Sequence, residues 1–176
     1  GGYEWLNYED TAIRSAVGYV SQDVVGIRDS IENNIRLFRD EFSFDEVRNA
    51  AKTAELDSFV LNLANSYSTM LGDGGSGLSG GQLQRLEIAR ALLKKPLFLF
   101  LDEATSALDI PTEIKVYENL RSLGITIISV AHRLISAQMS DFVLSMDRGC
   151  QVEFGPPIEI LSKKGVYYKL MQADNS

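Results

Sequence analysis

A single cysteine, Cys150, is present in this sequence, so no disulfide bond can form within the chain, and a reducing compartment fits that composition. Long apolar runs are missing as well: the run from Ile125 to Ala131 is far too short to span a bilayer, and there is no signal peptide. Basic residues do not dominate, because 17 Lys and Arg stand against 24 Asp and Glu, a net charge of −7. The acidic balance argues against non-specific binding to nucleic acid. The lack of long apolar runs places any membrane part of the protein outside this sequence.

The residues that are present suffice for one domain with a core, because the chain has 176 residues and 45% of them are hydrophobic. Apolar runs predict strands at 17–20, 97–101 and 125–131, and we expect the second and third to be buried on both faces, as strands of parallel sheets are. Helical patterns follow at 82–95 and 111–124. This alternation predicts an α/β fold with a mainly parallel sheet flanked by helices.

A mostly helical region is predicted between the first two strands. Its clearest helix lies within 43–56, where Ser43 and Glu46 have the spacing of a capping box. After the third strand, a hairpin is predicted to turn at 147–149, and two helices are predicted to close the chain.

The segment 78–82 reads LSGGQ and overlaps a stretch, 72–81, that holds six glycines in ten residues, too many for a regular element. Ser79, Gly80 and Gly81 precede the next predicted helix, so backbone N–H groups should point out of its N-terminus. Glycines let a phosphate approach such groups closely, and the helix dipole favours the anion. An ordinary flexible loop with a helix cap is the alternative interpretation.

Two carboxylates follow the second strand. Asp102 stands at its end, the edge where open α/β sheets bind ligands, and an aspartate in this place holds Mg²⁺ in P-loop NTPases. Glu103 comes next and is a candidate to polarise a water against a γ-phosphate. Alternatively, Asp102 caps the following helix and Glu103 is a solvated surface charge. Gln22 and His132, the only histidine, also follow predicted strands, although a lone histidine is usually structural.

Together these segments resemble the nucleotide-binding domain of ATP-binding cassette (ABC) transporters, in the expected order and over nearly the whole chain. The matching segments are Gln22 in YVSQD for the Q-loop, TMLGDGG for the exporter-type TEVGERG loop with Asp73 in place of Glu, LSGGQ for the signature, LFLFLDE for Walker B with its glutamate, SALD (106–109) for the D-loop, and His132 for the switch histidine.

The resemblance implies a P-loop NTPase-like (RecA-like) fold with an inserted α-helical subdomain. It also implies a division of the chain into three parts. These are 1–28, a remnant of the core that ends in the Q-loop; 29–82, a helical subdomain that ends in the signature; and 83–176, the core with Walker B, the D-loop and the switch histidine.

Family members carry a Walker A loop, GxxxxGK[ST], upstream of the Q-loop, and this sequence contains no Gly-Lys dipeptide. We therefore expect the sequence to be the C-terminal portion of a cassette domain whose N-terminal part is missing, and to be inactive by itself as an ATPase. The aromatic residue that stacks on adenine should also lie upstream, so Tyr3, Trp5 and Tyr8 are not assigned that role.

By the same resemblance, the cofactors are ATP and Mg²⁺, and the parent protein is an exporter at the cytoplasmic side of the cell (inner) membrane. Its partners would be the transmembrane domains and a second nucleotide-binding domain, joined head to tail, with no nucleic acid. The implied residue roles are catalysis for Glu103 and His132; Mg²⁺ binding for Asp102 and Gln22; and nucleotide binding for Gln22, Leu78, Ser79, Gly80, Gly81, Gln82 and Asp109.

Two other classes compete with this interpretation. A soluble ABC-type ATPase of DNA maintenance would share Walker B, but such proteins carry long coiled coils beside the signature, and none is evident here. An inert interaction module could keep the fold and lose the nucleotide. Glu103 and His132 argue against that for the parent protein, but it stays an alternative for this fragment.

Overall fold

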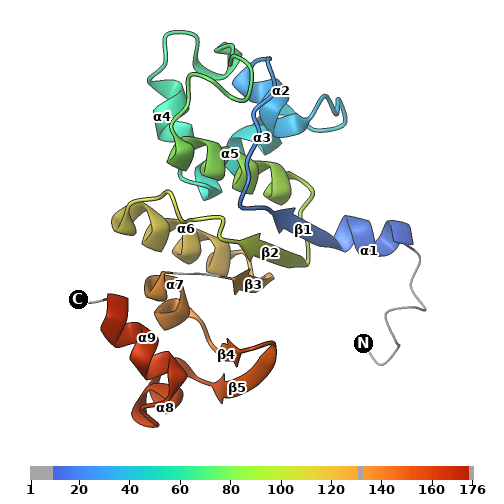
Figure 1. Cartoon of the computed structure of the whole chain (residues 1–176). Helices are drawn as coiled ribbons and strands as arrows, with labels where there is room; N and C mark the ends of the chain where they lie inside the picture. Colours follow the sequence, from blue (N-terminus) through green and yellow to red (C-terminus); the bar gives the residue numbers. More distant parts are fainter. Residues whose placement is uncertain (1–9, 131–132, 175–176) are drawn as a thin grey trace. The chain divides into compact units, whose positions relative to one another are not determined.

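The structure is a computed structural model, and it describes residues 10–130 and 133–174 (Figure 1). The chain divides into two compact units, Gly1–Val130 and Ala131–Ser176. The helices and strands of the first unit are α1 Asp10–Ala16, β1 Val17–Val20, α2 Ile31–Arg36, α3 Phe44–Thr53, α4 Asp57–Leu61, the 3-10 helix Ser66–Ser68, α5 Gly80–Leu93, β2 Phe98–Asp102, α6 Ile110–Ser122 and β3 Thr126–Val130. Those of the second unit are α7 Leu134–Met139, β4 Val143–Asp147, β5 Cys150–Gly155, α8 Pro157–Ser162 and α9 Val166–Asp174.

The sheet of the first unit has three parallel strands in the order β1-β2-β3, which confirms the predicted α/β class with a parallel sheet and helices. The register aligns Val20 with Leu101 and Asp102 with Val130, so the carboxyl ends of the strands meet at one edge of the sheet. Ligands bind at this edge in open α/β sheets.

Helices α5 and α6 cover one face of the sheet. A Cβ on Gly18 of β1 would lie 2.9 Å from the Leu99 side chain and 3.4 Å from the Ala91 carbonyl oxygen of α5, so only glycine fits there without a shift. On the same face, the Tyr117 hydroxyl of α6 lies 2.9 Å from the Ser129 hydroxyl of β3. Because parallel neighbours are joined by right-handed crossovers, the two successive crossovers place both helices on one side.

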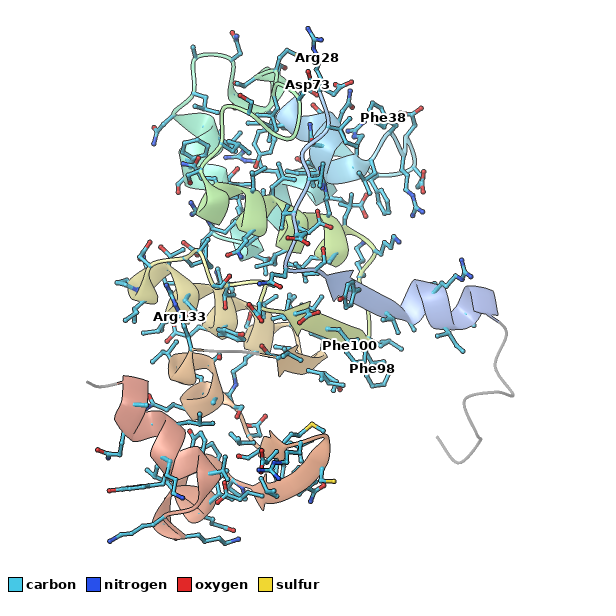
Figure 2. The ribbon with its side chains drawn as sticks, in the orientation of Figure 1. Arg28, Phe38, Asp73, Phe98, Phe100 and Arg133 are labelled. Atoms are coloured by element: carbon cyan, nitrogen blue, oxygen red, sulfur yellow. The ribbon has the colours of Figure 1, made fainter. Side chains whose placement is uncertain are left out.

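Among the described residues of this chain nothing covers the opposite face, so here the prediction that β2 and β3 are covered on both faces was wrong. Phe98 is 43% exposed, Ile128 45% and Val130 59%, whereas Leu99 and Leu101 are fully buried. Figure 2 shows Phe98 and Phe100 pointing away from α5. Continuous apolar runs indicated burial on two sides, but both crossover helices lie on one side.

The helical region packs against α5. Helix α3 begins with the predicted capping box, in which the Ser43 hydroxyl accepts from the Glu46 N–H and the Glu46 carboxylate accepts from the Ser43 N–H. Fully buried side chains from several of these helices form the core, namely Ile31, Ile35, Val47, Ala51, Leu56, Leu86 and Ile88.

A buried polar cluster fixes the chain that follows β1. Arg90 of α5 donates to the Asn34 side-chain oxygen at 2.8 Å and to the Val25 carbonyl at 2.9 Å. Asn34, fully buried, donates to the Ile27 carbonyl at 2.8 Å and accepts from the Ile27 N–H at 2.7 Å. These bonds tie the segment 25–34 to helix α5.

The second unit contains the predicted hairpin and closing helices. Strands β4 and β5 are antiparallel and pair Asp147 with Cys150. Arg148 and Gly149 between them have φ angles of 49° and 77°, the positive values of a two-residue hairpin turn. Ile160, Tyr167 and Met171 of α8 and α9 form its small core.

Among the described residues, no helix combines the length and the apolar character needed to cross a membrane. The three-part division at 28/29 and 82/83 stays a prediction.

Candidate functional site

Three predicted site residues meet at the carboxyl edge of the sheet. Gln22 lies two residues past β1, Asp102 ends β2, and Glu103 follows it. The Gln22 side-chain amide donates to a Glu103 carboxylate oxygen at 2.8 Å, although 81 residues separate the two. Tyr19 of β1 donates its hydroxyl proton to an Asp102 carboxylate oxygen at 3.0 Å. The following helix, α6, is capped by Asp109, so Asp102 does not cap it, which was the alternative considered from the sequence.

The two carboxylates are half-buried and have different partners. The hydrogen bond to Asp102 is the main cause that raises the pKa of the Tyr19 phenol, so this hydroxyl stays protonated as a donor. Hydrogen bonds fix both the side chain and the backbone of Glu103. Its carboxylate accepts from Gln22, and its N–H donates to the Val130 carbonyl at 2.9 Å. Its φ of 50° is unusual for a residue other than glycine, and such strain persists where the surroundings impose it.

The signature segment forms the start of α5. The helix begins at Gly80, two residues earlier than predicted, with Ser79 as its N-cap. The Ser79 hydroxyl accepts from the Gln82 N–H, and the Gln82 side chain accepts from the Ser79 N–H at 2.8 Å, a second capping box. Gly80 and Gly81 are the first two helical residues, whose N–H groups have no partner within a helix.

This helix N-terminus is presented outward. Ser79 and Gly80 are exposed, and Leu78 is half-buried with its N–H donating to the Gly75 carbonyl at 3.2 Å. An anion brought to this surface would meet the N–H groups of the first turn and the positive end of the helix dipole. Both original interpretations, a helix cap and an anion site, are compatible with that geometry.

Asp109 caps helix α6. Its two carboxylate oxygens accept from the Thr112 N–H at 3.0 Å and the Thr112 hydroxyl at 2.9 Å, and these bonds lower the pKa of the Asp109 carboxyl. Its assignment to nucleotide binding stays a prediction. His132 lies outside the described residues, and its catalytic assignment also stays a prediction.

Sequence reasoning missed Gln84 and Tyr19. Gln84 is buried in α5 and bonds to the turn that follows Asp102. A glutamine inside the apolar pattern of a helix was the signal available for it. Tyr19 gave no comparable signal, because its contact with Asp102 depends on the pairing of β1 and β2.

Asp102 and Gln22 were predicted to bind Mg²⁺. Among the described residues, no group of three or more His, Cys, Asp and Glu side chains is placed to hold a metal ion. Mg²⁺ commonly takes only one or two carboxylates, with phosphate oxygens and waters completing its octahedron. Asp102 offers one such carboxylate, and its assignment to Mg²⁺ together with Gln22 stays a prediction.

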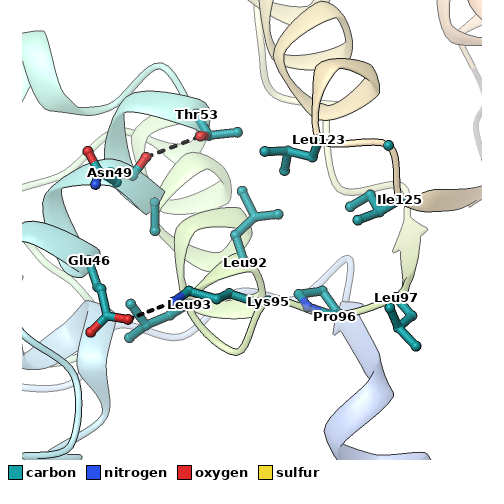
Figure 3. A pocket seen from close by; sticks show the side chains of 12 residues that line it. Glu46, Asn49, Thr53, Leu92, Leu93, Lys95, Pro96, Leu97, Leu123 and Ile125 are labelled. Atoms are coloured by element: carbon teal, nitrogen blue, oxygen red, sulfur yellow. Dashed lines mark hydrogen bonds and ion pairs between the residues drawn. The ribbon is translucent and has the colours of Figure 1, made fainter.

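A cavity of about 470 Å³ lies elsewhere, between α3, the end of α5 and the turn before β3 (Figure 3). Leu92, Leu123 and Ile125 line it, and the Glu46–Lys95 ion pair of 2.8 Å stands at its wall. None of the predicted site residues that the structure describes lines this cavity, so it is separate from their part of the candidate site.

The family model, the curated relatives and the solved structure that resemble this chain all indicate one family. A family model described as ABC transporter matches residues 2–106. Heavy metal tolerance factor 1 of Caenorhabditis elegans is 42% identical over 174 residues, covering 98% of this chain and 22% of that protein. The exotoxin translocation ATP-binding protein PaxB of Pasteurella aerogenes is 42% identical, covering 97% of this chain and 24% of the relative. ATP-binding cassette sub-family B member 5 of Homo sapiens is 39% identical, covering 92% of this chain and 13% of the relative.

Among solved structures, a bacterial Atm1-family ABC exporter with ATP bound superposes with a TM-score of 0.91 at 38% identity. The match covers 99% of this chain and 31% of the exporter chain. The chain thus spans about a quarter or less of the length of these curated relatives, and about a third of the solved exporter chain.

Proposed function

The chain belongs to the ABC transporter family, and we propose that it acts in ATP hydrolysis as part of an exporter at the cytoplasmic face of a membrane. The observation that carries the proposal is the meeting of Gln22, Asp102 and Glu103 at the carboxyl edge of the sheet. The 0.91 TM-score with an exporter that has ATP bound supports an exporter over a soluble ATPase of DNA maintenance.

In this proposal Glu103 acts on the attacking water. Its carboxylate accepts a proton from the water as the water approaches the γ-phosphate of ATP. The Gln22 amide, 2.8 Å from one carboxylate oxygen, orients this group. Asp102 and Gln22 would hold Mg²⁺, which neutralises phosphate charge when bound. We keep the proposal that His132 contacts the γ-phosphate.

The signature would serve a second copy of the domain. Its exposed helix N-terminus is suited to the γ-phosphate of an ATP held by the partner, in a head-to-tail dimer. Leu78, Ser79, Gly80, Gly81 and Gln82 form this part of the shared site, and we propose that Asp109 belongs to the same interface.

The test is the substitution Glu103→Gln in a full-length transporter that carries this domain. ATP binding should be retained, while hydrolysis should fall by about 10²- to 10⁴-fold because a positioned base is lost. Glu118→Gln, the same chemical change at an exposed position of α6, is the control and should leave hydrolysis unchanged. Normal turnover in the Glu103 variant would refute its role as the base.

We further propose that the 176-residue sequence alone does not hydrolyse ATP. It contains no Gly-Lys dipeptide, and therefore no Walker A lysine or its cradle of backbone N–H groups. Calorimetric titration with Mg-ATP should show no micromolar binding; a micromolar dissociation constant would contradict this.

A further inference from the structure

Gln84 has no assigned role in the site described above, yet it bonds directly to the turn that carries Glu103. The residue lies on α5, five positions after Ser79, and only 5% of its surface is exposed. Its side-chain nitrogen donates to the Glu103 carbonyl at 3.3 Å and lies 3.0 Å from the Ser106 hydroxyl oxygen. Its side-chain oxygen accepts from the Ala107 N–H at 2.9 Å.

The turn that Gln84 holds lacks the hydrogen-bond ladder of a regular element. It leaves the sheet at Glu103, whose φ is 50°, and it is closed locally by the Ser106 N–H, 3.1 Å from the Glu103 carbonyl. Both ends of the turn therefore bond to one amide group of Gln84. Since a carboxylate moves with the backbone from which it projects, this amide affects the place of the Glu103 side chain.

The first turn of α5 also packs tightly against the same segment. A Cβ added at Gly81 would lie 2.8 Å from the Ala107 carbonyl oxygen and 3.3 Å from a Leu108 methyl group. No side chain fits between the two segments without a shift. The signature end of α5 and the turn after β2 therefore form one tightly packed body.

We propose that Gln84 is a positioning residue for ATP hydrolysis: it holds the turn after β2 so that Glu103 of the same chain points at the attacking water. The inference rests on the proposed function, in which Glu103 is the base. Because α5 presents the signature to the partner's nucleotide, Gln84 also joins the catalytic glutamate of one site to the signature of the other.

The first test is Gln84→Met in the full-length transporter. Methionine keeps an unbranched side chain of similar length and removes the three polar contacts. Displacing a reacting group by about 1 Å can cost about 100-fold in rate, so kcat should fall by about 10- to 100-fold, with the KM for ATP unchanged. The control is Ile88→Val, a fully buried position of the same helix, which removes one methylene at a modest cost in stability. A kcat loss in Gln84→Met no greater than in the control would overturn the proposal.

A second test separates an action through Glu103 from an action through the signature. Mixed dimers carry one Gln84→Met and one Glu103→Gln substitution, either in the same subunit or in different subunits. If Gln84 acts through its own Glu103, the same-subunit dimer keeps one working site, and the different-subunit dimer loses both. The reverse pattern would assign Gln84 to the signature, and equal hydrolysis in the two arrangements would leave it a purely structural residue; either result overturns the proposal.

Amide hydrogen exchange tests whether Gln84 holds the turn, independently of whether Glu103 is the catalytic base. In nucleotide-free transporter, the Ala107 amide should exchange roughly tenfold faster in Gln84→Met than in wild type, because its hydrogen bond is lost. If exchange quickens while Glu103→Gln leaves hydrolysis normal, the contact is real and the proposed base is wrong. If exchange is unchanged, Gln84 does not hold the turn and the inference fails.

Discussion

At the scale of single residues, close backbone contacts decide which side chains the site tolerates. Gly81 is a helical residue, and alanine is normally the better helix former by about 1 kcal/mol. Here the added Cβ would lie 2.8 Å from the Ala107 carbonyl oxygen, a backbone atom that cannot rotate away. At Gly80 the nearest atom to such a Cβ is the Ala107 Cβ at 3.5 Å, an ordinary contact.

We therefore expect Gly81→Ala to destabilise the chain by about 1–3 kcal/mol, the usual cost of overpacking, in spite of the better helix propensity. Gly80→Ala is the matched control and should leave the free energy of unfolding unchanged or slightly raised. Denaturant unfolding measures both. Equal stabilities of the two variants would mean that the contact with Ala107 is looser than the structure indicates.

A second residue-scale prediction concerns Asn34. Asn34→Leu removes the acceptor of the part-buried Ile27 N–H and of one buried bond of the Arg90 guanidinium. A polar group left unpaired in a buried place costs about 1–3 kcal/mol, so we expect a loss of stability in that range, chiefly from the Arg90 side. Asn33→Leu, the neighbouring and less buried asparagine, should cost less in the same thermal or denaturant unfolding experiment. A larger loss at Asn33 would contradict the proposed importance of the cluster.

At the scale of elements, polar groups at helix ends and on helix faces determine how α3 and α5 are held. Helix α3 carries a capping box that the sequence predicted, and Glu46 of that box also pairs with Lys95 at 2.8 Å, just beyond α5. The hydrogen bond from Lys95 is the main cause that lowers the pKa of Glu46 from 4.5 to about 2, with the Ser43 N–H adding to it. One carboxylate therefore joins a helix start to the end of another helix.

This depressed pKa predicts a pH dependence of stability. A carboxyl group whose pKa is lower in the folded chain stabilises it above its ordinary pKa, and that contribution disappears as the pH falls from 4.5 to about 2. Glu46→Gln should be less stable than wild type at pH 6, and the difference should shrink toward pH 2. Asp45→Asn, on the same first turn, is the control. A difference that is constant from pH 6 to pH 2 would show that the charge of Glu46 contributes nothing.

At the scale of the whole molecule, the proposed site is complete only when two copies of the domain meet. Asp102 and Glu103 lie at the sheet edge, whereas the exposed first turn of α5 belongs, in the proposal, to the partner's nucleotide. Ser79 stands at the outer end of this turn, so a long side chain there should obstruct the second subunit without reaching the Walker A loop of its own chain.

Ser79→Arg in a full-length transporter should allow ATP binding but prevent dimer closure and hydrolysis. Ser79→Ala is the control: it removes the cap, at a cost of about 1 kcal/mol, without adding bulk, so it shows how much of the effect is lost helix stability. Crosslinking across the dimer in the presence of ATP measures closure.

Mixed dimers make this prediction specific. When Ser79→Arg is paired with a partner that lacks its Walker A lysine, both changes fall on one shared site, and some ATP-dependent closure should survive. When both changes are in one chain, both sites should be lost. Equal crosslinking in the two arrangements would show that Ser79 does not act on the partner's nucleotide.

Local features of this protein followed from the sequence alone. The run 17–20 is a strand, Ser43 and Glu46 form a capping box, and the hairpin turns at Arg148 and Gly149, because each depends on residues a few positions apart. The order of the motifs likewise indicated the family. Periodicity, capping and turn chemistry are local properties, so a single sequence carries them.

Tertiary structure alone decided which residues meet. Three hydrogen bonds of the site join segments that are far apart in the sequence. They link Gln22 to Glu103, Tyr19 to Asp102, and the Ala107 N–H to Gln84. Apolar runs predicted strands correctly but could not tell that α5 and α6 lie on one side of the sheet. Which groups end up in contact depends on strand order and on the packing of distant segments, and no local pattern encodes either.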